Sequence, residues 1–173
     1  SQEDALEMLG VGSRAALRWR TPVAHPVGAP VLAKGLVFAV SADEGKLLAL
    51  SASNGEILWS ADVVSPTTGA VTDGELVVVS TEAGLAAFDI VSGASAWTLE
   101  GEVSSTPLVI NGEWISFVSV AGSLEIVNWS GGKVASVTDA VPGVPPLLAG
   151  DSAIFFGKNA IRKFDASSKR AGV

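Results

Sequence analysis

The sequence predicts an all-β repeat protein, and three observations predict this fold class. One segment recurs four times along the 173-residue chain at nearly constant spacing. The apolar runs are short, as in buried strands, and far below the ~20 residues that a membrane helix needs. Gly, Asn and Ser separate these runs, as is typical of tight turns between strands. The chain is long enough to bury a core, and we expect a single domain over residues 1–173.

The recurring segment defines the repeat. A polar residue recurs at spacings of 38, 39 and 37 residues, at Ser51, Asp89, Asn128 and Asp165. The first two copies also share a small residue, a turn glycine and a tryptophan, namely Ala49, Gly55 and Trp59, then Ala87, Gly93 and Trp97. In the third copy we align Gly132 with these glycines and Ser136 with the tryptophans, and the fourth copy lacks both. The repeats therefore cover about 21–61, 62–99, 100–138 and 139–173.

Each repeat predicts four short antiparallel strands. In the first repeat we expect them near residues 29–33, 36–41, 46–51 and 56–60. The intervening turns contain Gly35, Gly45 and Gly55, which supply the positive φ that tight hairpins need. One four-stranded meander cannot cover both of its own faces, so neighbouring repeats must cover each other. The expected architecture is a small or partial β-propeller with about four blades.

The second copy resembles the tryptophan-docking motif of pyrroloquinoline-quinone-type, or quinoprotein-like, β-propellers. Ala87, Asp89, Ser92, Gly93 and Trp97 all match this motif. The resemblance covers about residues 14–173, and it implies that the tryptophan packs between adjacent blades while the Asp and Ser fix the turn. It does not specify a function, because such blades occur in dehydrogenases, in outer-membrane assembly lipoproteins and in luminal domains of membrane proteins.

The two ends of the chain depart from the repeat. Residues 1–10 predict a short helix, with Ser1 and Asp4 approximating a capping box. Residues 15–20 read as an orphan fourth strand, because Trp19 lies 40 residues before Trp59. The fourth repeat supplies three clear strands, near 145–149, 152–157 and 160–164, and a poor fourth one. Three arrangements remain open. The orphan strand closes a ring, within one chain or between copies, if it completes the last blade. Otherwise the chain is part of a larger ring, or it forms an open arc that uses a partner chain.

Catalytic and metal-binding constellations are not expected. The chain has no Cys, and its one histidine, His25, lies in a loop between prolines. The resemblance implies that a quinoprotein dehydrogenase of this type holds calcium and quinone between converging carboxylates and often has a disulfide at that site. The present chain has no Cys to form one. The acidic pair Asp43 and Glu44 reads as a solvated hairpin turn. We therefore predict no catalytic residue, no metal and no cofactor.

Charge and aromatic residues suggest where partners bind. The net charge of −7 argues against nucleic acid, because phosphate binding needs a basic face. Residues 21–157 carry a net −11, whereas residues 1–20 and 158–173 together carry +4. We expect partners to bind at the turn residue Trp129 and at four terminal bases, Arg18, Arg20, Arg162 and Lys163.

The sequence favours a non-enzymatic scaffold that binds other proteins. The resemblance to outer-membrane assembly lipoproteins implies an extracytoplasmic (periplasmic or luminal) location and a membrane-protein complex as partner, with self-association through the ends of the arc also expected. Two alternatives remain open at this point. One is a domain of a quinoprotein oxidoreductase, and the other is the luminal sensor domain of a membrane protein.

Overall fold

The computed structural model describes residues 16–166, which form β-strands in four antiparallel sheets. The sheets are called blades 1 to 4. Blade 1 contains β1 (Pro26–Ala33), β2 (Leu36–Ser41), β3 (Lys46–Ser51) and β4 (Ile57–Asp62). Blade 2 contains β5 (Val71–Thr72), β6 (Leu76–Thr81), β7 (Gly84–Asp89) and β8 (Ser95–Glu100). Blade 3 contains β9 (Val109–Ile110), β10 (Trp114–Val118), β11 (Ser123–Asn128) and β12 (Lys133–Thr138). Blade 4 contains β13 (Leu147–Ala149), β14 (Ser152–Gly157) and β15 (Ala160–Asp165).

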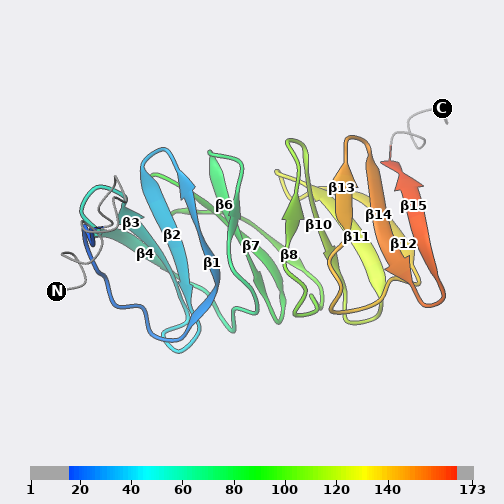
Figure 1. Ribbon diagram of the computed structural model, residues 1–173, viewed down its shortest axis with the longest axis horizontal. Coiled ribbons are helices and arrows are strands. Elements are labelled where there is room, and N and C mark those ends of the chain that lie inside the picture. Colours follow the sequence, from blue (N-terminus) through cyan, green and yellow to red (C-terminus); the bar gives the residue numbers. More distant parts are fainter. Residues whose placement is uncertain (1–15, 167–173) are drawn as a thin grey trace, which may run out of the picture.

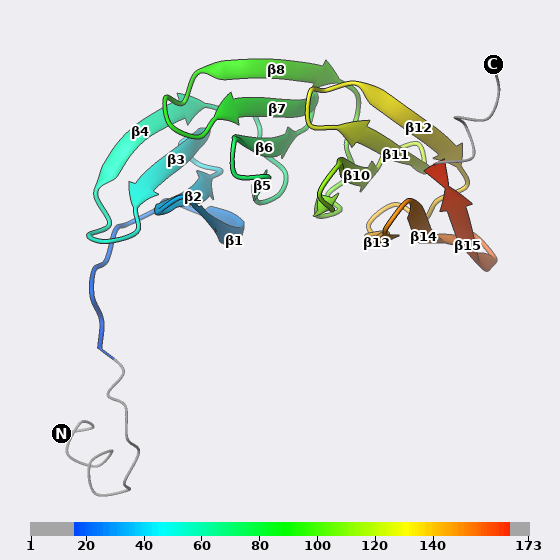
Figure 2. The same ribbon diagram turned by 90° about the horizontal axis from the view of Figure 1, so that it is seen from above.

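The blades stand side by side in an open arc (Figure 1). In each blade the strands follow one another as an antiparallel meander. Figure 2 shows β1, β5 and β13 on the concave side of the arc and β4, β8 and β12 on its convex side. The prediction of an all-β, propeller-type fold is confirmed, with four strands in each of blades 1 to 3 and three in the described part of blade 4. The expected helix at residues 1–10 lies outside the described residues.

Hydrophobic clusters fill the space between successive blades. Alternate side chains of a strand point to opposite faces, so each blade sends one set of residues forward and one set back. Between blades 1 and 2, Phe38, Val40 and Leu47 pack against Val77 and Val79, and all five are almost completely buried. Two further clusters join blade 2 to blade 3 and blade 3 to blade 4. Each blade is therefore stabilised mainly by its neighbours.

Strand β1 of blade 1 approaches the segment just before β5 of blade 2 closely at two glycines, Gly28 and Gly69. A Cβ added to Gly28 would lie 2.5 Å from the Cα of Gly69, and Gly28 has a φ of 66°. Only glycine satisfies both the positive φ and this spacing. At the concave side of the arc, blades 1 and 2 therefore touch at this point through backbone atoms rather than side chains.

Residues 16–166 do not close into a ring in the structure (Figure 2). Residues 16–23 are not in a strand and lie against blade 1, at the opposite end of the arc from β15 (Figure 2). The expected strand over residues 15–20 is therefore wrong for residues 16–20, and Ala15 lies outside the described residues. A lone strand without a neighbour has no backbone partners to keep it extended.

Candidate interaction surfaces

The two docking tryptophans join each blade to a turn of the next. Trp59 Nε1 donates a hydrogen bond to the carbonyl of Ile90 at 3.0 Å, and Trp97 Nε1 donates to the carbonyl of Trp129 at 2.7 Å. The Trp59 ring lies so close to Gly93 that an added Cβ would come within 2.7 Å of it. Each indole thus packs on a turn glycine and satisfies a turn carbonyl, which is a favourable use of a half-buried tryptophan.

The third copy of the motif needs a correction. Gly131, with a φ of 82°, faces the Trp97 ring, although the sequence alignment places Gly132 there. Ala135 pairs with Ile126 as Trp59 pairs with Ala49, so Ala135 rather than Ser136 takes the tryptophan position. The physical reason is a shorter turn, in which the Gly131 N–H donates to the Asn128 carbonyl. The corresponding bonds in the first two copies span one residue more.

Trp19 docks on blade 1 in the same way. Its Nε1 donates to the Ala52 carbonyl at 3.0 Å, and its ring lies against Gly55, where an added Cβ would come within 2.4 Å. The Thr21 hydroxyl donates to the Gly55 carbonyl at 2.5 Å. Residues 16–23 therefore occupy the place of a fourth strand in front of blade 1, as the in-phase spacing of Trp19 indicates.

Trp129 is not the exposed contact that its position in a turn suggests. Its side chain is half-buried and packs against the cluster between blades 2 and 3. Its Nε1 atom is buried and has no hydrogen-bond partner within the described part of the chain. The same turn accepts the hydrogen bond from Trp97 through the Trp129 carbonyl, so both the backbone and the side chain of Trp129 contribute to the contact between blades 2 and 3.

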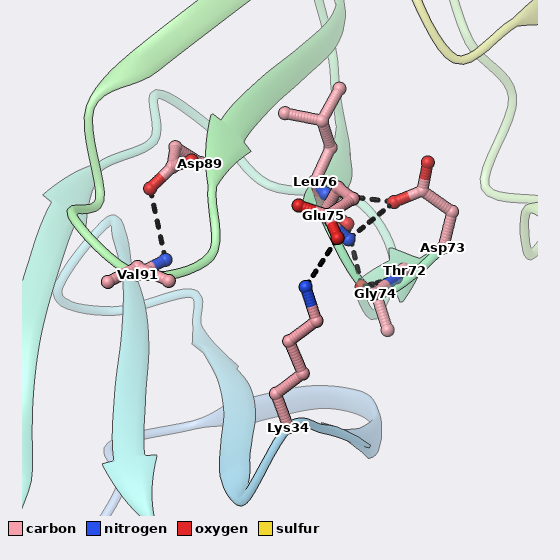
Figure 3. A network of polar contacts seen from close by, with 8 residues as sticks. All are labelled: Lys34, Thr72, Asp73, Gly74, Glu75, Leu76, Asp89 and Val91. Carbon is pink, nitrogen blue, oxygen red and sulfur yellow. Dashed lines mark hydrogen bonds and ion pairs between the residues drawn. The ribbon is translucent and has the colours of Figure 1, made fainter.

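Asp89 holds the docking turn of blade 2 together. Its carboxylate accepts hydrogen bonds from the backbone N–H groups of Ser92 and Val91, at 2.8 and 3.1 Å, and from the Ser92 hydroxyl at 2.8 Å. Figure 3 shows Lys34, in the β1–β2 turn of blade 1, paired with Glu75 in the β5–β6 turn of blade 2. The bonds from Ser92, then the one from Val91 and the charge of Lys34, hold the pKa of Asp89 below its usual range.

This lowered pKa predicts a loss of stability at acid pH. The native carboxyl has a lower pKa than the unfolded one, so its contribution is complete above the unfolded pKa and is lost as the pH falls through the native pKa. We expect Asp89→Asn to be less stable than the unsubstituted protein at pH 7 and the difference to shrink toward acid. Urea unfolding at a series of pH values measures it. A constant difference across that range contradicts the assignment.

The four terminal bases lie at opposite ends of the arc. Arg18 and Arg20 are exposed on residues 16–23, while Arg162 and Lys163 are exposed on β15. Arg162 pairs with Asp139 at 2.6 Å and Lys163 with Asp165 at 3.3 Å. The structure therefore does not bring the four together within one chain, and it gives each pair a separate surface.

His25 and Asp43 lie close together at the surface of the first blade. His25 Nδ1 lies 3.3 Å from Asp43 Oδ1, and both side chains are about two-thirds exposed. Within residues 16–166, no three His, Cys, Asp or Glu side chains converge in a way that suits a metal ion. The same part of the chain contains no helix that is long and apolar enough to cross a membrane.

A surface that the sequence did not predict runs along one edge of the sheets, over two loops that connect blades and two turns, β6–β7 and β10–β11, that lie within blades. Three backbone hydrogen bonds join these loops side by side: Glu82 N–H to Ser65 O, Gly101 N–H to Ala83 O, and Val120 N–H to Glu102 O. We call the surface of residues 64–65, 82–83, 101–102 and 120 the connector face. Val64 is 81% exposed and Val120 is 55% exposed, and the acids Glu82 and Glu102 lie beside them. The face thus presents one exposed valine at each end and acidic side chains between them.

A groove of about 340 Å³ opens next to this face, between blades 1 and 2. Val64, Leu99 and Phe88 form part of its apolar lining, and Asp62 and Glu100 lie at its acidic rim. Asp62 is paired with Lys46, whereas no ion pair is found for Glu100 among residues 16–166. The connector face with its groove therefore suits a partner that presents apolar and basic side chains together.

A sequence model of one family matches most of the chain. The family is described as outer membrane protein assembly factor BamB, and the match covers residues 11–162. The chain belongs to this BamB family. Its repeats are thus of the quinoprotein-like type that the docking motif indicates, and no curated protein matches the sequence.

Solved structures agree with the BamB fold. BamB from Moraxella catarrhalis is similar with a TM-score of 0.71 and 19% identity, over 87% of this chain and 50% of that one. Hsv2 from Kluyvelomyces marxianus is similar with a TM-score of 0.61 and 12% identity, over 77% of this chain and 43% of that one. The KlHsv2 protein in which a Gly-Ser linker replaces loop 6CD gives a TM-score of 0.61 at 14% identity, over 76% and 46%. The chain thus spans about half the length of these structures, and at such identity they show the fold alone.

In this BamB-like chain, sequence reasoning missed the connector face because its residues are scattered. Val64, Glu82, Glu102 and Val120 come from four separate connections, and none belongs to a motif. The sequence does contain one signal for these residues, which is the place that each holds relative to the strands of its repeat. Each follows the second or fourth strand of a blade, and these strands end at the same edge of the sheet.

Proposed function

We propose that the chain is a non-enzymatic scaffold that binds other proteins during the assembly of membrane proteins outside the cytoplasm. The observation that carries this proposal is the match of residues 11–162 to a family described as an outer membrane protein assembly factor. The described blades form one continuous arc, which supports a single domain over residues 1–173. Localisation in the periplasm or another extracytoplasmic compartment belongs to the same proposal.

The connector face supports the proposal physically. Blades that are packed face to face hold their connecting loops rigidly, and such loops commonly carry binding residues. The face combines Val64 and Val120 with the acids Glu82 and Glu102, on a framework of backbone hydrogen bonds. A partner therefore gains apolar contact at the two ends of the face, and the acids between them supply charge complementarity that speeds its approach. The mechanism is passive, because the chain positions its partner and changes no bond.

Site-specific photo-crosslinking in the native host tests this function. We expect a crosslinking residue at Val64 or Val120 to capture a component of an outer-membrane assembly complex, identified by mass spectrometry. Val91 is the matched control, because it is a similarly exposed valine in the β7–β8 turn, at the other edge of the sheets. The double variant Glu82→Lys, Glu102→Lys should weaken the capture at Val120, since a basic partner is then repelled.

Two results contradict the scaffold. One is capture at Val91 that equals capture at Val64 and Val120, which indicates nonspecific contact. The other is a clear rise in melting temperature on adding calcium and pyrroloquinoline quinone, because a ligand that binds only the native state stabilises it by mass action. That second result favours the alternative of a quinoprotein oxidoreductase domain.

A further inference from the structure

A small cavity of about 70 Å³ lies between blades 2 and 3. Its walls are apolar side chains from the contact between these blades, namely Leu85, Leu99, Val103 and Phe117. Gly101 and Glu102 of the connector face also line the cavity, so it adjoins that face. Its volume is far below the ~300–1,000 Å³ of small-molecule sites and suits the end of one side chain.

Glu125 of β11 places a carboxylate in this apolar cavity. Its Oε1 atom accepts a hydrogen bond from the Ser136 hydroxyl at 2.8 Å, whereas Oε2 is buried and accepts none within residues 16–166. A buried carboxylate oxygen without a partner costs free energy. Lys133 lines the same cavity, but in the described part of the chain it forms no ion pair with Glu125. The Oε2 atom is therefore available to a cation that comes from outside the chain.

The corresponding position in the other blades is apolar. Glu125 is the third residue of β11, and the third residues of β3 and β7 are Leu48 and Ala86. Packing between blades therefore does not require a carboxylate at this position. A residue that breaks the pattern of its repeat at a cost in stability is typical of a functional site.

Two more carboxylates flank the cavity. Glu100 and Glu102 line it and are exposed, and neither side chain takes part in an ion pair or hydrogen bond among residues 16–166. The three acids around the cavity outnumber its one base, Lys133. They do not converge as the ligands of a metal ion do, since no such cluster occurs in the described residues. The cavity thus suits an organic cation on an apolar stem.

A lysine side chain has this structure, because a flexible methylene stem carries a compact ammonium group. The Ser136 hydroxyl already binds Oε1 of Glu125, which leaves a single oxygen without a partner. The bidentate fork of an arginine guanidinium pairs with both oxygens of a carboxylate, whereas an ammonium group acts as a point charge. The free oxygen and the small volume therefore favour lysine over arginine.

We propose that a lysine side chain of the partner protein enters this cavity, with its methylene groups along Leu99 and Phe117 and its ammonium group at Glu125 Oε2. This inference rests on the proposed scaffold function, and it identifies the residue that anchors the partner. Glu100 and Glu102 attract the ammonium group as it approaches. A side chain that fills a desolvated pocket contributes far more to affinity than charges at the rim of an interface.

A capped lysine tests the cavity without any partner protein. The probe is Nα-acetyl-lysine methylamide, and NMR follows the backbone amide signals of Glu125, Glu102 and Phe117 in the full chain. We expect saturable shifts of these signals. Glu125→Gln and Glu125→Ala should each weaken binding roughly tenfold, because a hydrogen bond to a charged group is lost.

Two controls separate the carboxylate in the cavity from the acidity of the whole surface. Glu113→Ala removes the same charge from the exposed β9–β10 turn, at the other edge of blade 3, and should leave the affinity unchanged. Glu125→Ala should melt no lower than the unsubstituted protein, because the same position of blade 2 is Ala86. This variant therefore tests binding in a folded chain.

Two further probes separate the stem from the charge. Nα-acetyl-norleucine methylamide carries an apolar chain without an ammonium group, and we expect no shifts at the three amides. Nα-acetyl-arginine methylamide should bind more weakly than the lysine probe. Norleucine binding as tightly as lysine, or arginine binding more tightly, overturns the assignment of the occupant.

Three other results also overturn the proposal. The first is the absence of shifts even at high concentrations of the lysine probe, in which case the cavity holds only water. The second is equal affinity of Glu125→Ala and the unsubstituted protein, because the exposed acids then bind the probe alone. The third is a melting temperature of Glu125→Ala that is several degrees lower, which gives the carboxylate a role in the fold. Capture at Val64 and Val120 is unaffected by these outcomes, so the scaffold function then stands without this anchor.

Discussion

Trp97→Ala should lower the free energy of unfolding by about 3–5 kcal/mol, as large-to-small substitutions of packed aromatic residues do. The indole fills the contact between blades 2 and 3, lies against Gly131 and donates to the Trp129 carbonyl. Its loss leaves a cavity and an unsatisfied carbonyl at the same place. Urea denaturation, followed by the fluorescence of the remaining tryptophans, measures the change.

Val91→Ala is the control for this substitution. Val91 is an apolar residue of the neighbouring docking turn, but it is 71% exposed, so its truncation should change stability by less than about 0.5 kcal/mol. If Trp97→Ala is as mild as Val91→Ala, the tryptophan does not hold the blades together. The alignment of the repeats on the docking motif then fails as well.

Much of the fold could be predicted from the repeat itself. The spacing of Ser51, Asp89 and Asn128 sets the phase, and the turn glycines set the ends of the strands. The place of Trp59 follows from the same phase, because a fourth strand always faces the next blade. Local pattern is sufficient here because the paired strands of each meander and the turns between them lie close together in the sequence.

The errors occur where local pattern is not sufficient. One residue less in the third turn moves the docking role from Gly132 to Gly131, and a sequence alignment by spacing does not detect such a change. The Trp129 side chain packs against a cluster formed by blades 2 and 3, and its carbonyl accepts from Trp97, which is 32 residues away. The extended geometry of residues 16–20 depends on a strand partner that the described chain does not supply. The first error is a change of turn length within blade 3, whereas the other two concern contacts beyond a single blade.

Gly84→Ala should be among the most destabilising single substitutions in the protein, at roughly 3 kcal/mol or more from backbone strain and overpacking together. Gly84 begins β7 with a φ of 142°, a conformation that residues with a side chain rarely adopt. An added Cβ would lie 1.8 Å from the carbonyl oxygen of Leu99 in β8, which is backbone and cannot rotate away. The strand pair β7–β8 must therefore separate at this point.

Gly74→Ala separates backbone strain from overpacking. Gly74 lies in the turn between β5 and β6 with a φ of 95°, but an added Cβ would meet no atom within 4 Å. It should therefore show the strain alone, at about 1–3 kcal/mol. Thermal unfolding of both variants measures the difference, and Gly84→Ala should melt several degrees below Gly74→Ala. Equal melting temperatures contradict the close approach of β7 to β8 and, with it, the tight edge that carries Glu82 and Ala83 on the connector face.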